Sequence, residues 1–226
     1  MVSKNFILFG ANSELATTFA EEIVLSNHKV YGISRSVVPY LDEKNQIQIK
    51  NYIDYSDKLH DFIKKIDEPY LIFFNGYLAE NRPKYLPNQL EIEKTIYANY
   101  LTPLNLTNKI FNNHNVKKFV YISSIAAVKP RLKNYIYGLS KKSLEESISR
   151  IHSLNYLIIR FGQIETSMSE THNTPPFTLT KKEASKKMIK LLPKKGLQYA
   201  SVQLLLASIL IKLLPTKLLD KIEKML

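Results

Sequence analysis

The sequence predicts an α/β fold in which a doubly wound parallel sheet carries helices on both faces. Runs of β-branched and aromatic residues recur at 2–10, 28–35, 46–53, 68–76, 117–124 and 155–162. Most intervals between these runs have helical spacing, as over 14–26, 57–66, 90–112 and 140–152. Strands that alternate with helices indicate βαβ units and a parallel sheet. The runs are continuously apolar, as expected when helices cover both faces of the sheet.

Composition favours one domain. The 226 residues are 45% hydrophobic and contain no internal repeat or linker-like tract, so we expect a single domain over 1–200 and a helical extension over 201–226. The absence of cysteine excludes disulfides and thiolate chemistry and fits a reducing cytoplasm. The first residues lack the apolar region and cleavage site of a signal peptide and are expected to form the first strand.

The chain is strongly basic, with 32 Lys and Arg against 20 Asp and Glu and a formal charge of +12. Three interpretations stay open: a solvated basic surface, an anionic substrate or cofactor, and an anionic membrane surface. We expect no nucleic-acid partner, because the sequence has no zinc-finger spacing, RNA-binding aromatic signature or recognition-helix pattern. It also has no metal-ligand pattern, so we expect no metal site.

The first strand ends at Gly10, and a helical pattern opens within four residues. A helix N-terminus offers unpaired N–H groups and a partial positive charge, so this turn is suited to a bound phosphate. The alternative is that a tight strand-to-helix turn simply needs a glycine. The chain has only six glycines, and Gly10, Gly76 and Gly162 all end predicted strands, where a parallel sheet binds its ligand.

Tyr137 and Lys141 lie one helical turn apart and place a phenol and an ammonium group on the same helix face. A nearby cation favours phenolate, so we expect the pKa of Tyr137 to fall toward the working pH. The spacing alone is not specific, because the chain has 14 tyrosines and a second such pair, Tyr40 and Lys44. That pair lies away from any predicted strand end, and we expect it at the surface.

Two further polar residues are candidates for the same chemistry. Ser124 ends the apolar run FVYIS, where its hydroxyl could donate to a substrate carbonyl or simply cap the next turn. Asn99 lies inside a predicted helix, where asparagine is mildly unfavourable. It could hold a water behind the tyrosine and lysine, or decorate the surface.

Taken in order along nearly the whole chain, these residues resemble the short-chain dehydrogenase/reductase family, whose fold is of the Rossmann type. Gly10-x-x-x-Glu14-x-Ala16 resembles the family's glycine-rich turn, and Phe161-Gly162 with Thr166 resembles its Pro-Gly-x-x-x-Thr segment. The resemblance assigns the catalytic tetrad to Asn99, Ser124, Tyr137 and Lys141. It assigns cofactor binding to Gly10, Asn12, Ser13, Glu14, Leu15, Ser34, Arg35, Asp54, Asn75, Gly76, Tyr137, Lys141, Gly162 and Thr166.

The resemblance also implies a mechanism. NADPH would deliver hydride to a ketone carbon while Tyr137 protonates and Ser124 holds the oxygen. Lys141 would lower the tyrosine pKa and bind the nicotinamide ribose, and Asn99 would position a proton-relay water. Glu14 and Ala16 replace two glycines of the family's turn, so the Glu14 carboxylate must point away from the pyrophosphate, and Phe161 replaces a proline.

NADP is expected rather than NAD, because the second strand ends in Ser34-Arg35-Ser36. A guanidinium and hydroxyls suit a 2′-phosphate, whereas an acidic residue there would bind a free ribose diol. Asp42 lies too far past the strand to be that acid. Asp54 matches the family's adenine-contacting acid.

More loosely, the chain resembles the decaprenylphosphoryl-2-ketoribose reductase branch, through its Gly-Ala-x-Ser-Glu-x-Ala turn, its Asn-Gly-Tyr-Leu segment and a Leu-Leu-Pro helix near the end. The branch implies reduction of a lipid- or nucleotide-linked keto-sugar in cell-surface polysaccharide synthesis. The alternatives are a reductase of a small lipophilic ketone or 3-oxoacyl substrate, and a non-catalytic NADP-sensing protein. The substrate pocket is expected between 77–87 and 167–178, with His172 solvated.

The apolar stretch 202–214 is too short to span a bilayer, and the helical pattern after Pro215 is basic and amphipathic. It could pack on its own domain or on the partner in a homodimer, or it could dock on a membrane surface. We therefore expect a cytoplasmic protein, with the inner face of the membrane as a second location.

Overall fold

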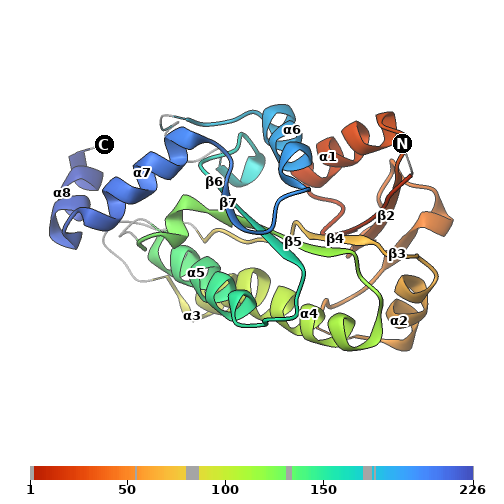
Figure 1. The fold of residues 1–226 in the computed structure, drawn as a ribbon. Coiled ribbons are helices and arrows are strands. Elements are labelled where there is room, and N and C mark those ends of the chain that lie inside the picture. Colours follow the sequence, from red (N-terminus) through yellow and green to blue (C-terminus); the bar gives the residue numbers. More distant parts are fainter. Residues whose placement is uncertain are drawn as a thin grey trace.

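The computed structural model describes residues 3–53, 55–79, 87–130, 134–169, 175 and 177–225. Seven strands form one parallel sheet in the order β3-β2-β1-β4-β5-β6-β7 (Figure 1). Their bounds are β1 Asn5–Phe9, β2 Lys29–Ser34, β3 Gln46–Gln48, β4 Tyr70–Phe73, β5 Lys118–Ser124, β6 Tyr156–Phe161 and β7 Gly196–Tyr199. The order reverses between β1 and β4, and such a switch point leaves a crevice at the carboxyl ends of the strands.

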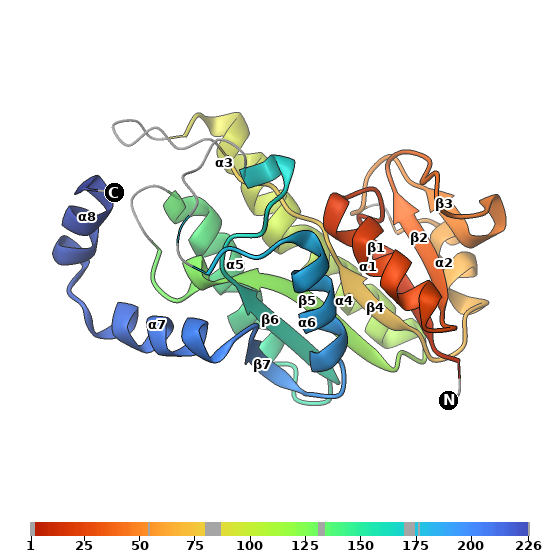
Figure 2. The ribbon, with the colours of Figure 1, turned by 90° about the horizontal axis from the view of Figure 1, so that it is seen from above.

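Helices cover both faces of this sheet (Figures 1 and 2). One face carries α1 Glu14–Leu25 and α6 Lys181–Leu191, and the other carries α2 Asp57–Lys64, α3 Gln89–Ile96, α4 Thr102–Asn113 and α5 Tyr135–Ser149. A π-helical turn, Tyr97–Leu101, joins α3 to α4. Short 3-10 turns lie at Glu43–Asn45, Ile125–Ala127 and Ser167–Ser169.

An apolar core lies between the sheet and each of the two helical layers. Strand β1 shows how one strand supplies residues to both cores. Phe6 and Leu8 face the core under α1 and α6, while Ile7 and Phe9 face the core over α2, α4 and α5. Successive side chains of a strand point to opposite faces of the sheet, so a strand buried on both sides must be apolar throughout. The continuous apolar runs of the sequence follow from this requirement.

Side-chain caps fix where several helices begin. The hydroxyls of Ser13, Ser56 and Ser201 accept from a first-turn N–H of α1, α2 and α7. Reciprocal capping boxes open α3 at Asn88 and α6 at Thr180. Each cap satisfies N–H groups that the helix itself leaves without partners.

The predicted α/β fold is confirmed, and the six predicted strands are present within narrower bounds. The predicted helix over 90–112 is built from α3, the π-helical turn and α4, and α5 begins at Tyr135, before the predicted start at 140. Neither α6 nor β7 was among the predicted elements. Their segments, KKEASKKMIKL and GLQY, are lysine-rich or very short and carry little periodic signal of their own.

The chain then leaves the sheet through α7, Val202–Leu213, and α8, Thr216–Met225, which extend beyond the three-layered body (Figures 1 and 2). Within α7, Leu204 and Ser208 are buried. Across the described part of the chain, no helix combines the length and apolarity needed to cross a bilayer.

Candidate active site

The predicted catalytic residues converge at the carboxyl ends of β4 and β5. Gly76, which follows β4, shows how close these residues lie. A Cβ placed on it would lie 3.4 Å from Asn99 Oδ1 and 4.0 Å from Lys141 Nζ. Gly76 therefore lies directly against side chains from the π-helical turn and from α5. The adjacent β5 ends at Ser124.

The Ser124 side chain lies close enough to the Tyr137 phenol to lower its pKa. The Ser124 hydroxyl also accepts from the N–H of Ala126 at 3.2 Å, so it caps the following turn as well. Gly138 makes this arrangement possible, because a Cβ there would lie 2.6 Å from the Ala126 carbonyl oxygen. The missing side chain lets the first turn of α5 approach the end of β5 and brings the phenol to the serine.

Lys141 is buried, with 5% of its surface exposed. Its Nζ donates to the Ile122 carbonyl at 2.9 Å and lies 5.9 Å from the centre of the Tyr137 ring. Burial lowers the pKa of Lys141 to about 8, against the opposing effect of the nearby Glu145 carboxylate. The ammonium group is therefore poised to change charge just above neutral pH.

The expectation that the Tyr137 pKa falls toward neutrality is wrong for this structure. Burial raises the pKa of Tyr137 to about 12, and the nearby Ser124 side chain offsets only part of the increase. Withdrawing a phenol from water penalises its charged form. At neutral pH Tyr137 is therefore a protonated hydroxyl, which is the form that donates a proton.

Asn99 is fully buried in the π-helical turn. Its Oδ1 accepts from the Tyr77 N–H at 3.1 Å, and its Nδ2 donates to the Tyr77 carbonyl at 2.7 Å. The side chain thus fixes the backbone that follows Gly76, and it keeps one Oδ1 lone pair and one Nδ2–H for a further partner such as a water. π-Helical turns often occur at functional sites.

The turn after β1 fits the phosphates of a dinucleotide. Gly10 has φ +76°, and a Cβ on it would lie 3.1 Å from the Asn75 backbone nitrogen, so both conformation and close approach require glycine. The first-turn N–H groups of Glu14 and Leu15 have no acceptor among the described residues. The buried Asn75 Oδ1 also lacks a described partner. These groups would accept an anionic ligand with hydrogen-bonding groups.

The Glu14 carboxylate is turned away from this turn's free N–H groups. It accepts from the Ser167 N–H at 2.8 Å and from Lys181 Nζ at 2.6 Å. These contacts lower the pKa of Glu14 to about 2. The glutamate that replaces a glycine therefore fastens α1 to the segment after β6 and to the start of α6.

Two phosphate ligands, Ser34 and Arg35, are predicted at the end of β2, and they differ in whether a ligand could reach them. Ser34 is buried and its hydroxyl donates to the Ser36 carbonyl, so the expected phosphate contact by this side chain is not supported. Arg35 is exposed. The Asn12 side chain donates to the Ser36 hydroxyl at 3.1 Å and joins the two cofactor-side turns.

Tyr52 was missed by the sequence analysis. Its hydroxyl lies 3.4 Å from the Ile33 carbonyl and interacts with Arg35, the Asn75 side chain and the Gly10 backbone. Burial raises the pKa of Tyr52, and those three neighbours oppose the increase. The phenol thus stands where the carboxyl ends of β1, β2 and β4 meet. Its position two residues before Asp54 was the available signal.

The other predicted cofactor contacts lie on the far side of the site. Gly162 is covered by α7, because a Cβ on it would lie 3.3 Å from Leu204 Cδ2. The Thr166 N–H donates to the Ser169 hydroxyl at 3.2 Å. Asp54, His172 and most of the predicted pocket loops, at 80–86, 170–174 and 176, lie outside the described residues.

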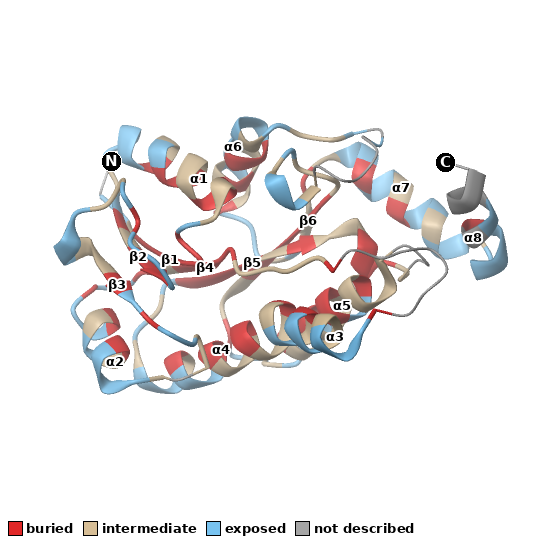
Figure 3. Ribbon diagram, turned by 180° about the vertical axis from the view of Figure 1, so that it is seen from behind, coloured by how far each residue is buried: buried red, intermediate tan, exposed pale blue. Residues whose placement is uncertain are grey.

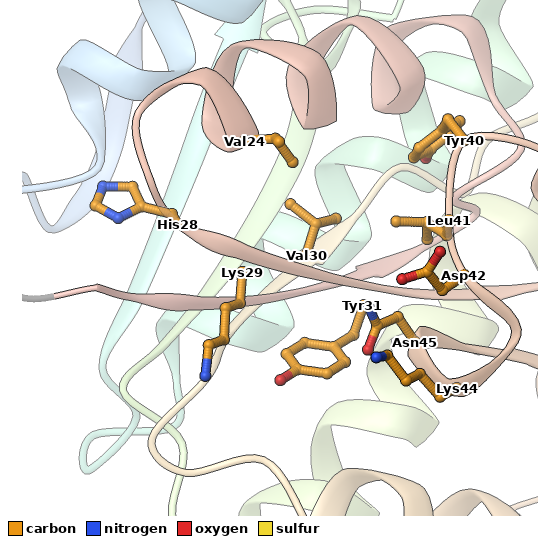
Figure 4. A pocket seen from close by; sticks show the side chains of 10 residues that line it. All are labelled: Val24, His28, Lys29, Val30, Tyr31, Tyr40, Leu41, Asp42, Lys44 and Asn45. Carbon is orange, nitrogen blue, oxygen red and sulfur yellow. The ribbon is translucent and has the colours of Figure 1, made fainter.

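Tyr40 corrects another expectation. Its hydroxyl donates to the Ala11 carbonyl at 2.6 Å, its ring packs against the core under α1, and burial raises its pKa. It therefore steadies the glycine turn rather than decorating the surface. Beside it is a hollow of about 490 Å³ between α1, β2 and the segment before β3 (Figure 4). Among the described residues, no predicted site residue lines this hollow, so it is separate from the candidate active site.

No family model and no curated protein matches the sequence. Solved structures do match. A short-chain dehydrogenase from Burkholderia cenocepacia J2315 in complex with NADP has a TM-score of 0.76 and 16% identity over 94% of this chain and 98% of its own. Thermoplasma acidophilum aldohexose dehydrogenase has a TM-score of 0.69 and 15% identity over 87% of this chain and 92% of its own. ElxO with NADP bound has a TM-score of 0.71 and 17% identity over 90% of this chain and 99% of its own.

These similarities extend over nearly the full length of both partners, at identities where the fold is what is shared. The resemblance inferred from the motifs is confirmed at this level. The chain has the fold of the short-chain dehydrogenases/reductases.

Proposed function

We propose that the protein is an NADP-dependent oxidoreductase that reduces a ketone. The observation that carries the proposal is the meeting of Ser124, Tyr137 and Lys141 beside Gly76, at the carboxyl edge of the sheet. Tyr137 can donate a proton, the neighbouring Ser124 hydroxyl can hold the substrate oxygen, and the buried Lys141 ammonium lies 5.9 Å from the phenol ring.

The turn at Gly10, the first turn of α1 and the Asn75 side chain would hold the dinucleotide. Arg35, exposed at the end of β2, would pair with a 2′-phosphate, and this favours NADP over NAD. NADP is bound in two of the matching structures. When bound, NADPH supplies the hydride that reduces the ketone carbon.

The chain's own residues supply the proton and hold the oxygen. The Ser124 hydroxyl donates to the ketone oxygen and stabilises the charge that develops there. The Tyr137 hydroxyl, protonated at neutral pH, transfers its proton to that oxygen. The Lys141 ammonium then stabilises the phenolate that remains. A tyrosine that stays protonated at neutral pH suits this acid role.

We further propose a lipid- or nucleotide-linked keto-sugar as the substrate, within cell-surface polysaccharide synthesis. The motif resemblance to keto-sugar reductases supports this, and one structural neighbour is an aldohexose dehydrogenase. The second candidate is a lipophilic ketone or a 3-oxoacyl chain. It is favoured by Met168, an exposed side chain whose Cε lies 3.9 Å from a Cβ placed on Gly76.

The test is turnover by purified protein with NADPH and three ketone classes: a polyprenyl-phosphate-linked keto-sugar, a nucleotide-linked keto-sugar and a 3-oxoacyl thioester. Loss of reduced-nicotinamide absorbance reports the reaction. We expect turnover of a keto-sugar, reduced about a hundredfold or more in Tyr137→Phe, while this variant still binds NADPH. NADPH binding without turnover of any of these ketones would contradict the proposed reductase and favour a nucleotide sensor.

A further inference from the structure

Helix α7 carries a continuous apolar face that is open to solvent. We call it the α7 stripe: Val202, Leu205, Leu206, Ile209, Leu210 and Leu213, which are between 40% and 77% exposed. Their spacing of three and four residues places them along one side of the helix. Figure 3 shows α7 largely exposed where it leaves the body. Large contiguous apolar patches on a protein surface mark interaction sites.

The opposite side of α7 is already fastened to the domain. Leu204 is buried against Gly162. Ser208, also buried, donates to the Tyr199 hydroxyl at 2.9 Å. At the far end of the helix, Lys129 Nζ donates to the Leu214 carbonyl at 2.5 Å. The helix cannot turn its stripe inward without breaking these contacts, so the stripe is a built surface.

The charged residue that α7 itself carries is a lysine. The sequence of α7 contains no Asp or Glu, and Lys212 lies at the edge of the stripe by helical geometry. Lys212 is exposed, as are Lys217 and Lys221 on α8, whose sequence also contains Asp220 and Glu223. The whole chain has a formal charge of +12. An apolar face with a lysine rim is suited to a surface that offers both acyl chains and negative headgroups.

We propose that the α7 stripe docks the protein on an anionic lipid surface. The stripe enters the boundary between headgroups and acyl chains, and Lys212 at its edge faces the anionic headgroups. At about 18 Å long, α7 lies in the plane of the surface and does not span it. A second copy of this chain is a weaker candidate for covering the stripe, because pairing two such faces would bring like charges together. Docking is independent of the proposed reduction, since the stripe contains no residue of the reaction site.

The experiment is co-sedimentation of the full chain with vesicles of pure phosphatidylcholine, or of an equal mixture with phosphatidylglycerol. We expect binding to the mixed vesicles, weakened by salt, and much less to the neutral ones. The double variant Leu206→Gln/Leu210→Gln should lower the partition coefficient at least about tenfold. Lys212→Glu/Lys217→Glu should lower it on anionic vesicles. The matched control is Val24→Gln/Leu25→Gln, two exposed apolar residues on α1, which should bind like wild type.

Circular dichroism and the thermal midpoint show that each variant is folded. Failure of the folded wild type to sediment with anionic vesicles would overturn the proposal, and so would equal binding by the Leu206/Leu210 variant. Sedimentation velocity without lipid tests the alternative that a second copy of this chain covers the stripe. A lipid-free dimer that the Leu206/Leu210 substitutions dissociate would also overturn the proposal, because the stripe would then be covered by another copy.

Discussion

At the scale of single residues, the site depends on side chains whose neighbours change their chemistry. Lys141 and Tyr137 share one helix face, yet burial moves their pKa values in opposite directions, to about 8 and about 12. The charged form is penalised in both cases, but it is the protonated form of lysine and the deprotonated form of tyrosine. Burial therefore keeps the tyrosine in its acid form and brings the titration of the lysine near neutrality.

This pair predicts the pH dependence of reduction. Tyr137 stays protonated up to about pH 12, so the group that titrates within the working range is Lys141, whose ammonium is lost as pH rises through about 8. We expect kcat/KM for ketone reduction to be flat below that pH and to fall above it. The measurement is a pH–rate profile of the free enzyme's kcat/KM. Lys141→Arg, which keeps its charge, should move the fall to higher pH; an unmoved fall would assign the titration to another group.

Arg35 gives the second prediction at this scale. Its exposed guanidinium stands at the end of β2, close enough to Tyr52 to influence the phenol's pKa. A charge-assisted bond to a 2′-phosphate is worth about 1.5–3 kcal/mol, so Arg35→Ala should weaken NADPH binding about tenfold or more. NADH binding should be unchanged. Fluorescence titration of both nucleotides measures this, with Arg150→Ala as the exposed-arginine control. Equal losses for NADPH and NADH would reject Arg35 as the discriminating residue.

At the scale of elements, the helix after the glycine turn is fastened to a segment far along the chain. Glu14 opens α1, and its two acceptor bonds reach Ser167 and Lys181, which lie 153 and 167 positions later. The segment after β6 is thereby held against the predicted pyrophosphate turn. A glutamate here both replaces a flexible glycine and adds a clamp.

Glu14→Gln should loosen this clamp. The amide keeps a weak acceptor but loses the charge that attracts Lys181, and the pair is more than a third exposed, so its effect on global stability should stay below about 1 kcal/mol. Nucleotide binding should weaken more clearly, by about threefold to tenfold, because the segment after β6 must then be ordered on binding. The measurement is NADPH affinity beside the thermal midpoint. Glu21→Gln on the same helix is the control, and an unchanged affinity would refute the clamp.

The elements differ in how much the sequence could reveal about them. The strands were predictable because burial on two faces demands uninterrupted apolar runs, and Gly10, Gly76 and Gly162 mark three strand ends. α6 and β7 were not, since the helix buries mainly Ala184, Ser185 and Met188 and draws its stability from packing on α1. The partners of Glu14 and the place of Tyr52 were hidden for a similar reason: contacts across the fold leave no local pattern.

At the scale of the whole molecule, a buried polar network joins α5, the helix of Tyr137 and Lys141, to the last part of the chain. Glu145, one turn beyond Lys141 on α5, accepts from the Ser123 hydroxyl at 2.5 Å and from Arg160 Nε at 2.9 Å, and it forms a second bond with the Arg160 guanidinium. Arg160 donates to the Tyr199 hydroxyl at 2.6 Å, which also accepts from Ser208. β5, α5, β6, β7 and α7 are thus connected through one ion pair.

The network predicts an asymmetric response to mutation. Arg160→Met leaves the Glu145 carboxylate buried without its cation, which should lower the free energy of unfolding by about 3–5 kcal/mol. Pairing it with Glu145→Leu removes both charges and should recover most of that loss, because an apolar pair of similar volume needs no compensation. Urea unfolding of the two single variants and the double variant measures the three values. Losses that simply add would show that the two residues act separately.

The double variant also tests the link to the site: without the Glu145 carboxylate, which raises the pKa of Lys141, the high-pH fall in kcat/KM should move to lower pH.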